Sequence, residues 1–258
     1  MPIVKKLLYF SYEKFLEKGV KRGEMPIHLG LILDGNRRYA KEMGYDDVTM
    51  GHKQGAKKLD DVLQWCADLG IKIITIWVFS TDNTQRDKEE VDALLKVIQE
   101  EIEGLAKSPV IKKNGFRIKA LGKIDTLPEE LKAAIRNSEK STQTHTNHML
   151  NIAIGYGGRE EIVEAVKKAI KEKKASTMDE LANSITSEDI TSHLYTNGIP
   201  DPDLIIRTSG EIRLSGFLLW QSAYSEFYFC DALWPVFRKI DFLRAIRSYQ
   251  HRSRRFGQ

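Results

Sequence analysis

The feature that most constrains the fold is the alternation of short apolar runs with longer amphipathic segments. The run IKIITIWVFS at 71–80 is nearly continuous in hydrophobicity, as a strand buried on both faces should be. Further runs are interpreted as strands at 28–35, 116–122, 148–158 and from 203 onward. Segments with a helical pattern lie at 55–70, 88–106, 128–142 and 159–174. This rhythm predicts an α/β fold with a mainly parallel central sheet flanked by helices.

The chain has 258 residues, enough for one large α/β domain or two small ones. It contains no internal repeat. The only candidate domain boundary is a charged, Ser/Thr-containing stretch around 171–179, which is interpreted as an exposed connection. We therefore expect one domain over 25–258, preceded by an amphipathic helix within 1–24.

That N-terminal segment, IVKKLLYFSYEKFLEK at 3–18, has apolar residues at roughly helical spacing and a lysine-rich polar side. Two interpretations remain open. The helix docks on the body of the protein, or it lies on a membrane surface, as basic amphipathic helices can.

Composition narrows the class of protein. A net charge of +4 and a pI near 8.8 are too weakly basic to suggest nucleic acid as a partner. Cys66 and Cys230 lie in apolar surroundings and are expected to be buried thiols, which suits a reducing compartment. No run reaches the ~18 apolar residues of a membrane span, and charges interrupt any signal-peptide layout. These features predict a soluble, cytoplasmic protein, which would be peripheral to the membrane if the N-terminal helix lies on a membrane surface.

The first predicted strand runs directly into the sequence LDGNRRYAKEMG. Ligands of open parallel sheets bind beyond the carboxyl ends of the strands. Asp34 lies at such an end, Gly35 frees the backbone, and Asn36 is expected to cap a helix that begins near Arg37. Such arginines suit a phosphate, and the carboxylate suits Mg²⁺. An Asx turn with surface arginines remains the alternative, and His52 in GHKQG is a weak candidate taken alone.

Two other predicted strands end in similar polar sequences. The strand at 71–80 leads into FSTDNTQR, although turn formation alone would also explain the Ser, Asp and Asn residues there. The last strand leads into RTSGEIRLSG, a turn that is expected to precede a helix. There is no Walker A motif and no Gly-x-Gly-x-x-Gly sequence, which disfavours a nucleotide. Arginines at three strand ends with a candidate metal carboxylate predict a site for two diphosphates.

Five segments, in order and spacing, resemble the cis-prenyltransferases, which include undecaprenyl and dehydrodolichyl diphosphate synthases. They are DGNRRYAK, GHKQGAKKL, FSTDNTQR, LNIAIGYGGREEI and DLIIRTSGEIRLSGFLLWQSAYSEFYF…LWP. The resemblance runs from about residue 27 to the C-terminus. It implies an Mg²⁺-dependent enzyme that extends an allylic diphosphate with the homoallylic isopentenyl diphosphate, making each new double bond cis. It also implies an apolar tunnel between the sheet and the helices for the growing chain.

The resemblance implies roles for individual residues. Asp34 matches the catalytic aspartate that works with Mg²⁺, Glu226 a second metal-linked carboxylate, and Asn83 a residue that helps remove the proton which sets the new double bond. The allylic phosphates would be lined by Gly35, Asn36, Arg37, Arg38 and His52, and isopentenyl diphosphate would be clamped by Arg207, Arg213 and Ser215. Further residues expected to bind substrate are Tyr39, Ser80, Thr81, Asp82, Arg86 and Leu214.

The C-terminal sequence RRFG matches an Arg-x-Gly tail, with Arg255 and Gly257, that in the family completes the site across a dimer interface. Catalytic motifs and tail lie on one chain, so the resemblance implies a homodimer. A non-catalytic partner subunit is disfavoured because such partners typically lose the Asp-Gly-Asn sequence and the clamp arginines, which this chain keeps.

Three departures from the family pattern leave the acceptor open. Bacterial members have an arginine between the Asp-Gly-Asn and Gly-His sequences, where this chain has YDDVTM without an arginine. The family usually has an aromatic residue at the position of Thr84 and a proline at the position of Asp87. The alternative activity is prenyl transfer to a non-isopentenyl acceptor, either irregular condensation with an allylic diphosphate or O-prenylation of a small alcohol. Longer-chain members of the family often have alanine at the position of Val78 and carry inserted residues in the helix at 88–106. This chain has the larger valine and no such insertion, so the resemblance implies a short- to medium-chain product.

Overall fold

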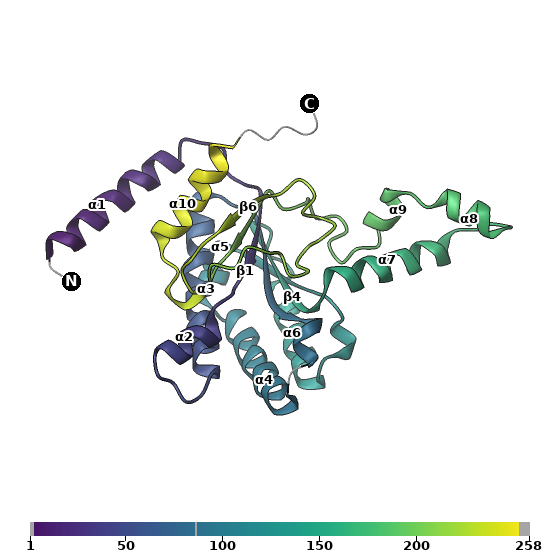
Figure 1. Ribbon diagram of the computed structural model, residues 1–258, viewed down its shortest axis with the longest axis horizontal. Coiled ribbons are helices and arrows are strands. Elements are labelled where there is room, and N and C mark those ends of the chain that lie inside the picture. Colours follow the sequence, from purple (N-terminus) through teal and green to yellow (C-terminus); the bar gives the residue numbers. More distant parts are fainter. Residues whose placement is uncertain (1–2, 86, 253–258) are drawn as a thin grey trace.

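The computed structural model describes residues 3–85 and 87–252. Its centre is a sheet of six parallel strands in the order β3-β4-β2-β1-β5-β6. The strands are β1 (His28–Ile32), β2 (Ile73–Ser80), β3 (Phe116–Leu121), β4 (His148–Tyr156), β5 (Leu204–Arg207) and β6 (Glu226–Phe229). Helices flank this sheet in a single domain (Figure 1), which confirms the predicted α/β architecture.

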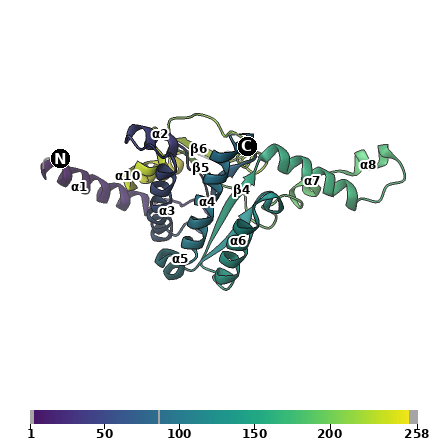
Figure 2. The same cartoon turned by 90° about the horizontal axis from the view of Figure 1, so that it is seen from below.

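Ten α-helices and three short 3-10 helices connect the described strands. The α-helices are α1 (Ile3–Val20), α2 (Asn36–Glu42), α3 (Thr49–Leu69), α4 (Lys88–Leu105), α5 (Pro109–Asn114), α6 (Glu129–Thr142), α7 (Gly158–Glu172), α8 (Met178–Ser184), α9 (Ser187–Thr191) and α10 (Lys239–Gln250). The 3-10 helices are η1 (Thr81–Gln85), η2 (Ile124–Thr126) and η3 (Trp234–Val236). Figures 1 and 2 show α1 projecting from one side of the body and α7 with α8 from the other.

Side chains alternate between two apolar layers, as the period of a strand requires. On β5, Leu204 and Ile206 join the larger core, which also contains residues of α3, α4, α6 and α10. Ile205 between them joins a smaller core on the opposite face, together with Phe217 and Leu218. Both faces of the sheet are therefore covered, and this explains why the strands read as nearly continuous apolar runs.

The N-terminal helix α1 docks on the body through its second half. Leu16 and Val20 are buried there, and Glu17 accepts hydrogen bonds from Lys239 of α10 at 3.0 Å and from Lys21 at 2.9 Å. These contacts confirm docking for part of the helix. Other apolar side chains of α1 remain exposed, namely Leu8, Phe10 and Phe15.

The segment after β5 departs from the prediction of a strand followed by a helix. Residues 208–225 form a series of turns that lead into β6, a strand that the sequence pattern did not suggest. Ser209, Ser215 and Leu218 have positive φ angles of 78°, 51° and 45°, which a helix does not tolerate. Phe217 and Leu218 are fully buried even so, because the turns press them onto the sheet. Hydrophobicity alone does not separate a buried turn from a buried helix.

Both cysteines are buried and free, as the sequence suggests. Over residues 3–85 and 87–252, no helix combines the length and hydrophobicity needed to cross a membrane.

Candidate active site

Three polar segments that are far apart in the sequence meet at the carboxyl edge of the sheet. β1 and β5 pair in register, so that Ile32 lies beside Arg207, and Asp34 follows shortly after Ile32. On the other side of β1, Ser80 is the last residue of β2. Parallel strands bring their carboxyl ends to one edge, and this creates the site from three loops.

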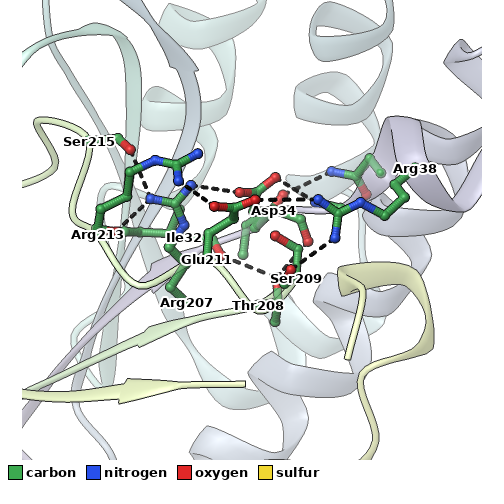
Figure 3. Close-up of polar contacts among 12 residues, drawn as sticks. Ile32, Asp34, Arg38, Arg207, Thr208, Ser209, Glu211, Arg213 and Ser215 are labelled. Carbon is green, nitrogen blue, oxygen red and sulfur yellow. Dashed lines mark hydrogen bonds and ion pairs between the residues drawn. The ribbon is translucent and has the colours of Figure 1, made fainter. Parts of the chain in front are cut away.

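Asp34 and Arg207 form the centre of the site (Figure 3). Asp34 Oδ2 accepts a hydrogen bond from Arg207 Nη2 at 2.7 Å, and Asp34 Oδ1 accepts one from the backbone N–H of Gly35 at 2.7 Å. Arg207 Nη1 also donates to the carbonyl of Arg213 at 2.5 Å and to Ser215 Oγ at 2.8 Å. The Arg207 side chain is 5% exposed and that of Asp34 is 37% exposed, so the arginine is fixed and the carboxylate is accessible.

Glu211 links arginines on the two sides of this centre, and it was not among the predicted site residues. One carboxylate oxygen lies 3.4 Å from Arg38 Nη2, and the other pairs with Arg213 (Figure 3). Arg38 Nη1 also donates to the carbonyl of Ser209 at 3.0 Å. Glu211 thus holds side chains from both predicted diphosphate sites. The only sequence signal for this role is its position two residues before Arg213.

The loop after β1 is shaped by close packing between α2 and α3. Asn36 is not the cap of α2 as expected. It begins the helix, because Gly35 at the preceding position has φ 105°, and its side-chain amide donates back to the carbonyl of Leu33 at 2.9 Å. A Cβ on Gly51 would lie 2.1 Å from the Asn36 carbonyl oxygen, and one on Gly55 2.3 Å from Asn36 Oδ1. The glycines of GHKQG therefore let α3 contact the start of α2 directly.

Within the FSTDNTQR segment, Thr81–Gln85 form η1, and reciprocal hydrogen bonds join Ser80 to Asn83. Asn83 Oδ1 accepts from the Ser80 backbone N–H at 2.9 Å, and Ser80 Oγ accepts from the Asn83 backbone N–H at 3.2 Å. Thr84 Oγ1 donates to the carbonyl of Thr81 at 2.6 Å. The register of β2 with β4 is irregular just before this point. These bonds fix Asn83 at the end of the strand.

A cavity of about 990 Å³ extends from this site between the sheet and the helices α3 and α4. Its apolar walls include Ile76 and Val78 from β2 and Leu94, Ile98 and Ile102 from α4. Val91 and Leu95, also on α4, do not line it. The cavity is polar at the Asp34 end and mainly apolar along α4, where Glu101 also lines it.

Most predicted site residues gather around the cavity. The predicted residues that line it are Asp34, Gly35, Asn36, Arg37, Arg38, His52, Ser80, Asp82, Asn83, Arg207 and Ser215. Tyr39, Thr81, Arg213 and Leu214 lie on the same loops without lining it. Tyr39 contacts the ring of Tyr45, and Leu214 packs on the smaller core. Arg86, Arg255 and Gly257 lie outside the described residues.

Glu226, which the resemblance matches to a second metal-linked carboxylate, lies apart from Asp34 within the chain. It is the first residue of β6 and lies beside Leu204, the first residue of β5, at the amino edge of the sheet. Its carboxylate accepts a hydrogen bond from Arg252 at 2.6 Å. Because the strands are parallel, the amino edge is the edge opposite Asp34. The sequence motif alone did not reveal on which edge Glu226 lies.

The donor set at Asp34 fits Mg²⁺ bound together with a substrate phosphate. Mg²⁺ is usually held by one or two carboxylates, substrate phosphates and water. Asp34 is accessible from the cavity, which Arg37, Arg38 and His52 also line. Among residues 3–85 and 87–252, no cluster of three or more His, Cys, Asp or Glu side chains forms a metal cage. The donor chemistry at Asp34 therefore fits a metal that binds together with a diphosphate.

Comparisons with known proteins agree with this geometry. A family model described as "Putative undecaprenyl diphosphate synthase" matches residues 32–257. An isoprenyl transferase of Thermus thermophilus is 56% identical over 253 residues, covering 97% of this chain and 96% of the relative. A tritrans,polycis-undecaprenyl-diphosphate synthase (geranylgeranyl-diphosphate specific) of Methanopyrus kandleri is 46% identical over 253 residues, covering 98% and 92%.

A solved structure extends the likeness to three dimensions. Lavandulyl diphosphate synthase from Lavandula x intermedia, in complex with dimethylallyl diphosphate, superimposes with a TM-score of 0.80 at 36% identity. The match covers 91% of this chain and 99% of the lavender protein. Sequence relationship along nearly the whole length and the shared parallel-sheet fold lead to one conclusion: this chain belongs to the undecaprenyl diphosphate synthase family, and it is a cis-type prenyltransferase.

Proposed function

We propose that this chain condenses an allylic prenyl diphosphate with isopentenyl diphosphate, with Mg²⁺ as cofactor, and releases a short- to medium-chain cis product. One observation carries the proposal: a buried arginine paired with an accessible carboxylate stands at the polar end of a cavity of about 990 Å³ with apolar walls. Such a cavity suits a molecule with an anionic head and a hydrocarbon tail.

In the proposed reaction, the C–O bond of the allylic diphosphate breaks and a C–C bond to isopentenyl diphosphate forms. A proton is lost from the isopentenyl part, and inorganic diphosphate leaves. Arg37, Arg38 and His52 would bind the allylic diphosphate, and Arg207, Arg213 and Ser215 would bind isopentenyl diphosphate. Fixed cationic side chains stabilise the charge that develops on the leaving group without reorganising.

Asp34 would hold Mg²⁺ against the allylic diphosphate, and when bound the metal supplies further neutralisation of the leaving oxygen. A neutral carboxamide is a weak base. We therefore assign Asn83 an orienting role in the loss of the proton, which the departing diphosphate accepts. The Asn83 side chain suits this role because Ser80 holds it at the end of β2.

The test is a product assay with purified protein, Mg²⁺, labelled isopentenyl diphosphate and a series of allylic diphosphates. We expect a series of products that differ by single five-carbon units, and this series should end at a short to medium chain length. Failure to incorporate label from isopentenyl diphosphate with every allylic partner would overturn the proposal.

A second candidate activity is prenyl transfer to another acceptor, either an allylic diphosphate or a small alcohol. The observation that favours it is Thr84, a small residue bonded back to Thr81 where the family has an aromatic ring. The lavender relative shows that the fold also carries a synthase named for lavandulyl diphosphate. Consumption of an allylic diphosphate without isopentenyl diphosphate in the same assay would select this activity.

We further propose that the protein acts as a cytoplasmic homodimer with peripheral membrane contact. The exposed side chains of Leu8 and Phe15 on α1, next to Lys14 and Lys18, support contact with an anionic lipid surface. Sedimentation of the protein with vesicles containing anionic lipid tests this contact. Equal sedimentation of a Leu8→Ser/Phe15→Ser variant would argue against it.

A further inference from the structure

An acidic residue interrupts the apolar stripe of α4 that faces the cavity. Leu94, Ile98, Glu101 and Leu105 follow one another at spacings of four, three and four residues, and all of them line the cavity. Residues with this spacing lie on one face of a helix. Glu101 therefore stands in line with the apolar wall, about 10 Å along the helix from Leu94.

Glu101 has no hydrogen bond or ion pair among the residues that the structure describes, although it is half-buried. Burial raises the pKa of its carboxyl group, and the nearby carboxylates of Glu100 and Asp60 raise it further, against the opposing effect of Lys53 and Lys57. An uncompensated carboxylate keeps part of its water shell, and removing that water costs free energy.

Asp60 supplies a second carboxylate at the same end, from the α3 wall. It lines the cavity and accepts a hydrogen bond from Ser108 Oγ at 2.9 Å. Lys57 and Lys107 also line this end and are exposed. The cavity thus passes from phosphate-binding side chains, along an apolar stretch, to a charged rim formed by these residues and Glu101.

We propose that Glu101 determines the length of the product. This inference rests on the proposed chain-elongating function and deepens it. Each condensation moves the hydrocarbon end five carbons further from the diphosphate site. When the end reaches Glu101, a further unit must strip water from a carboxylate that has no partner to replace it. Elongation then slows relative to release, and the product stops at that length.

The experiment compares product lengths of the wild type, Glu101→Leu and Glu100→Leu under identical substrate ratios. Glu100 precedes Glu101 on the same helix, is exposed and does not line the cavity, so Glu100→Leu is the matched control. We expect Glu101→Leu to lengthen the main product by at least one five-carbon unit. The first condensation, measured with a short allylic primer, should keep its rate, because Glu101 lies roughly 16 Å along α4 from Glu90, whose carboxylate is 3.3 Å from Arg37 at the site.

A Glu101→Gln variant keeps the shape and removes the charge, and it serves if the leucine variant does not fold. It should shift the product in the same direction by a smaller amount. Identical product lengths in the control and in a folded, active Glu101 variant would overturn the role of Glu101 and leave the proposed function standing. Failure of the wild type to incorporate isopentenyl diphosphate would instead overturn the proposed function.

Discussion

At the scale of single residues, the site depends on a few side chains with unequal exposure. Arg207 is nearly inaccessible and donates to Asp34, Ser215 and the carbonyl of Arg213. Asp34 is accessible and also bound to the adjacent backbone. Its main chain is held too, because Thr208 Oγ1 donates to the Asp34 carbonyl at 2.7 Å. This arrangement fixes the carboxylate before any substrate arrives.

Replacing Asp34 tests the centre of the proposed mechanism. Asp34→Ala should reduce turnover by about 10²-fold or more, the order found when a residue that stabilises transition-state charge is removed. Steady-state kinetics with saturating Mg²⁺ measure the loss, and circular dichroism checks the fold. Asp92→Ala, an exposed carboxylate on α4, is the control and should keep full activity. Near-normal turnover of Asp34→Ala would contradict the metal-site assignment.

At the scale of elements, close contacts between helices and strands hold the catalytic loops. α3 packs on the α2 loop only because Gly51 and Gly55 lack side chains. At the start of β1, His28 is buried and bridges two elements: Nε2 lies 2.7 Å from Thr75 Oγ1 on β2, and Nδ1 lies 2.6 Å from the Pro200 carbonyl before β5. These contacts set the relative position of the three strand ends.

Adding one methyl group at Gly51 should disturb that packing. Gly51→Ala places a Cβ against the backbone oxygen of Asn36, so the helix or the loop must move. We expect a loss of unfolding free energy of about 1–3 kcal/mol and a higher KM for the allylic diphosphate. Gly19→Ala on α1 meets no atom within 4 Å, and it should stabilise the protein by roughly 0.5–1 kcal/mol. Equal behaviour of the two variants in denaturant titrations would refute the packing argument.

His28 should make stability depend on pH. Burial lowers the pKa of its imidazole from 6.5 to about 4, so the folded state keeps the ring neutral. The stabilisation is complete above pH 6.5, and it is lost as pH falls from there towards 4, when the unfolded chain takes up the proton first. The loss amounts to roughly 3 kcal/mol. Urea titrations over this range measure it, and His28→Gln should flatten the profile. An unchanged slope in that variant would assign the effect to other groups.

At the scale of the whole molecule, one domain carries two projecting arms and a sheet whose edge strands are β3 and β6. α1 extends on one side and α7 with α8 on the other (Figures 1 and 2). The edge strand β6 is half-buried at all four residues, and its aromatic rings Phe227 and Phe229 stack at 6.3 Å. A half-covered aromatic edge suits a second copy of the chain, in line with the proposed homodimer.

The Arg-x-Gly tail gives that dimer a functional test. Removing residues 255–258 should impair binding of isopentenyl diphosphate, and Asp34→Ala should be inactive. Mixing the two variants should restore about a quarter of wild-type activity, because half of the randomly mixed dimers contain one complete site. Recovery of activity on mixing, with dimers confirmed by sedimentation, supports a tail that acts across the interface. No recovery despite mixed dimers would argue that the tail acts within its own chain.

The sequence predicts much of this architecture because its signals are local. The apolar run of β2, the helical period of α4 and the left-handed Gly70 at the end of α3 each depend on neighbours in the chain. Asp34, Asn83 and Arg207 were identified in the same way, from polar residues directly after apolar runs. The assigned family agrees with the resemblance carried by those segments.

Other features depend on contacts between distant segments, and no local pattern reveals them. Glu211 is a site residue because the pairing of β1 with β5 places Arg38 and Arg213 on its two sides, and this pairing is not visible in the local sequence. Glu226 lies at the amino edge of the sheet, opposite the edge that carries Asp34, because residues 208–225 form turns and β6 runs parallel to β5. The sequence by itself determined most of the elements, the family and most of the candidate residues at the site. The tertiary structure decided which of them meet, because side chains far apart in the chain become neighbours only through strand order and register.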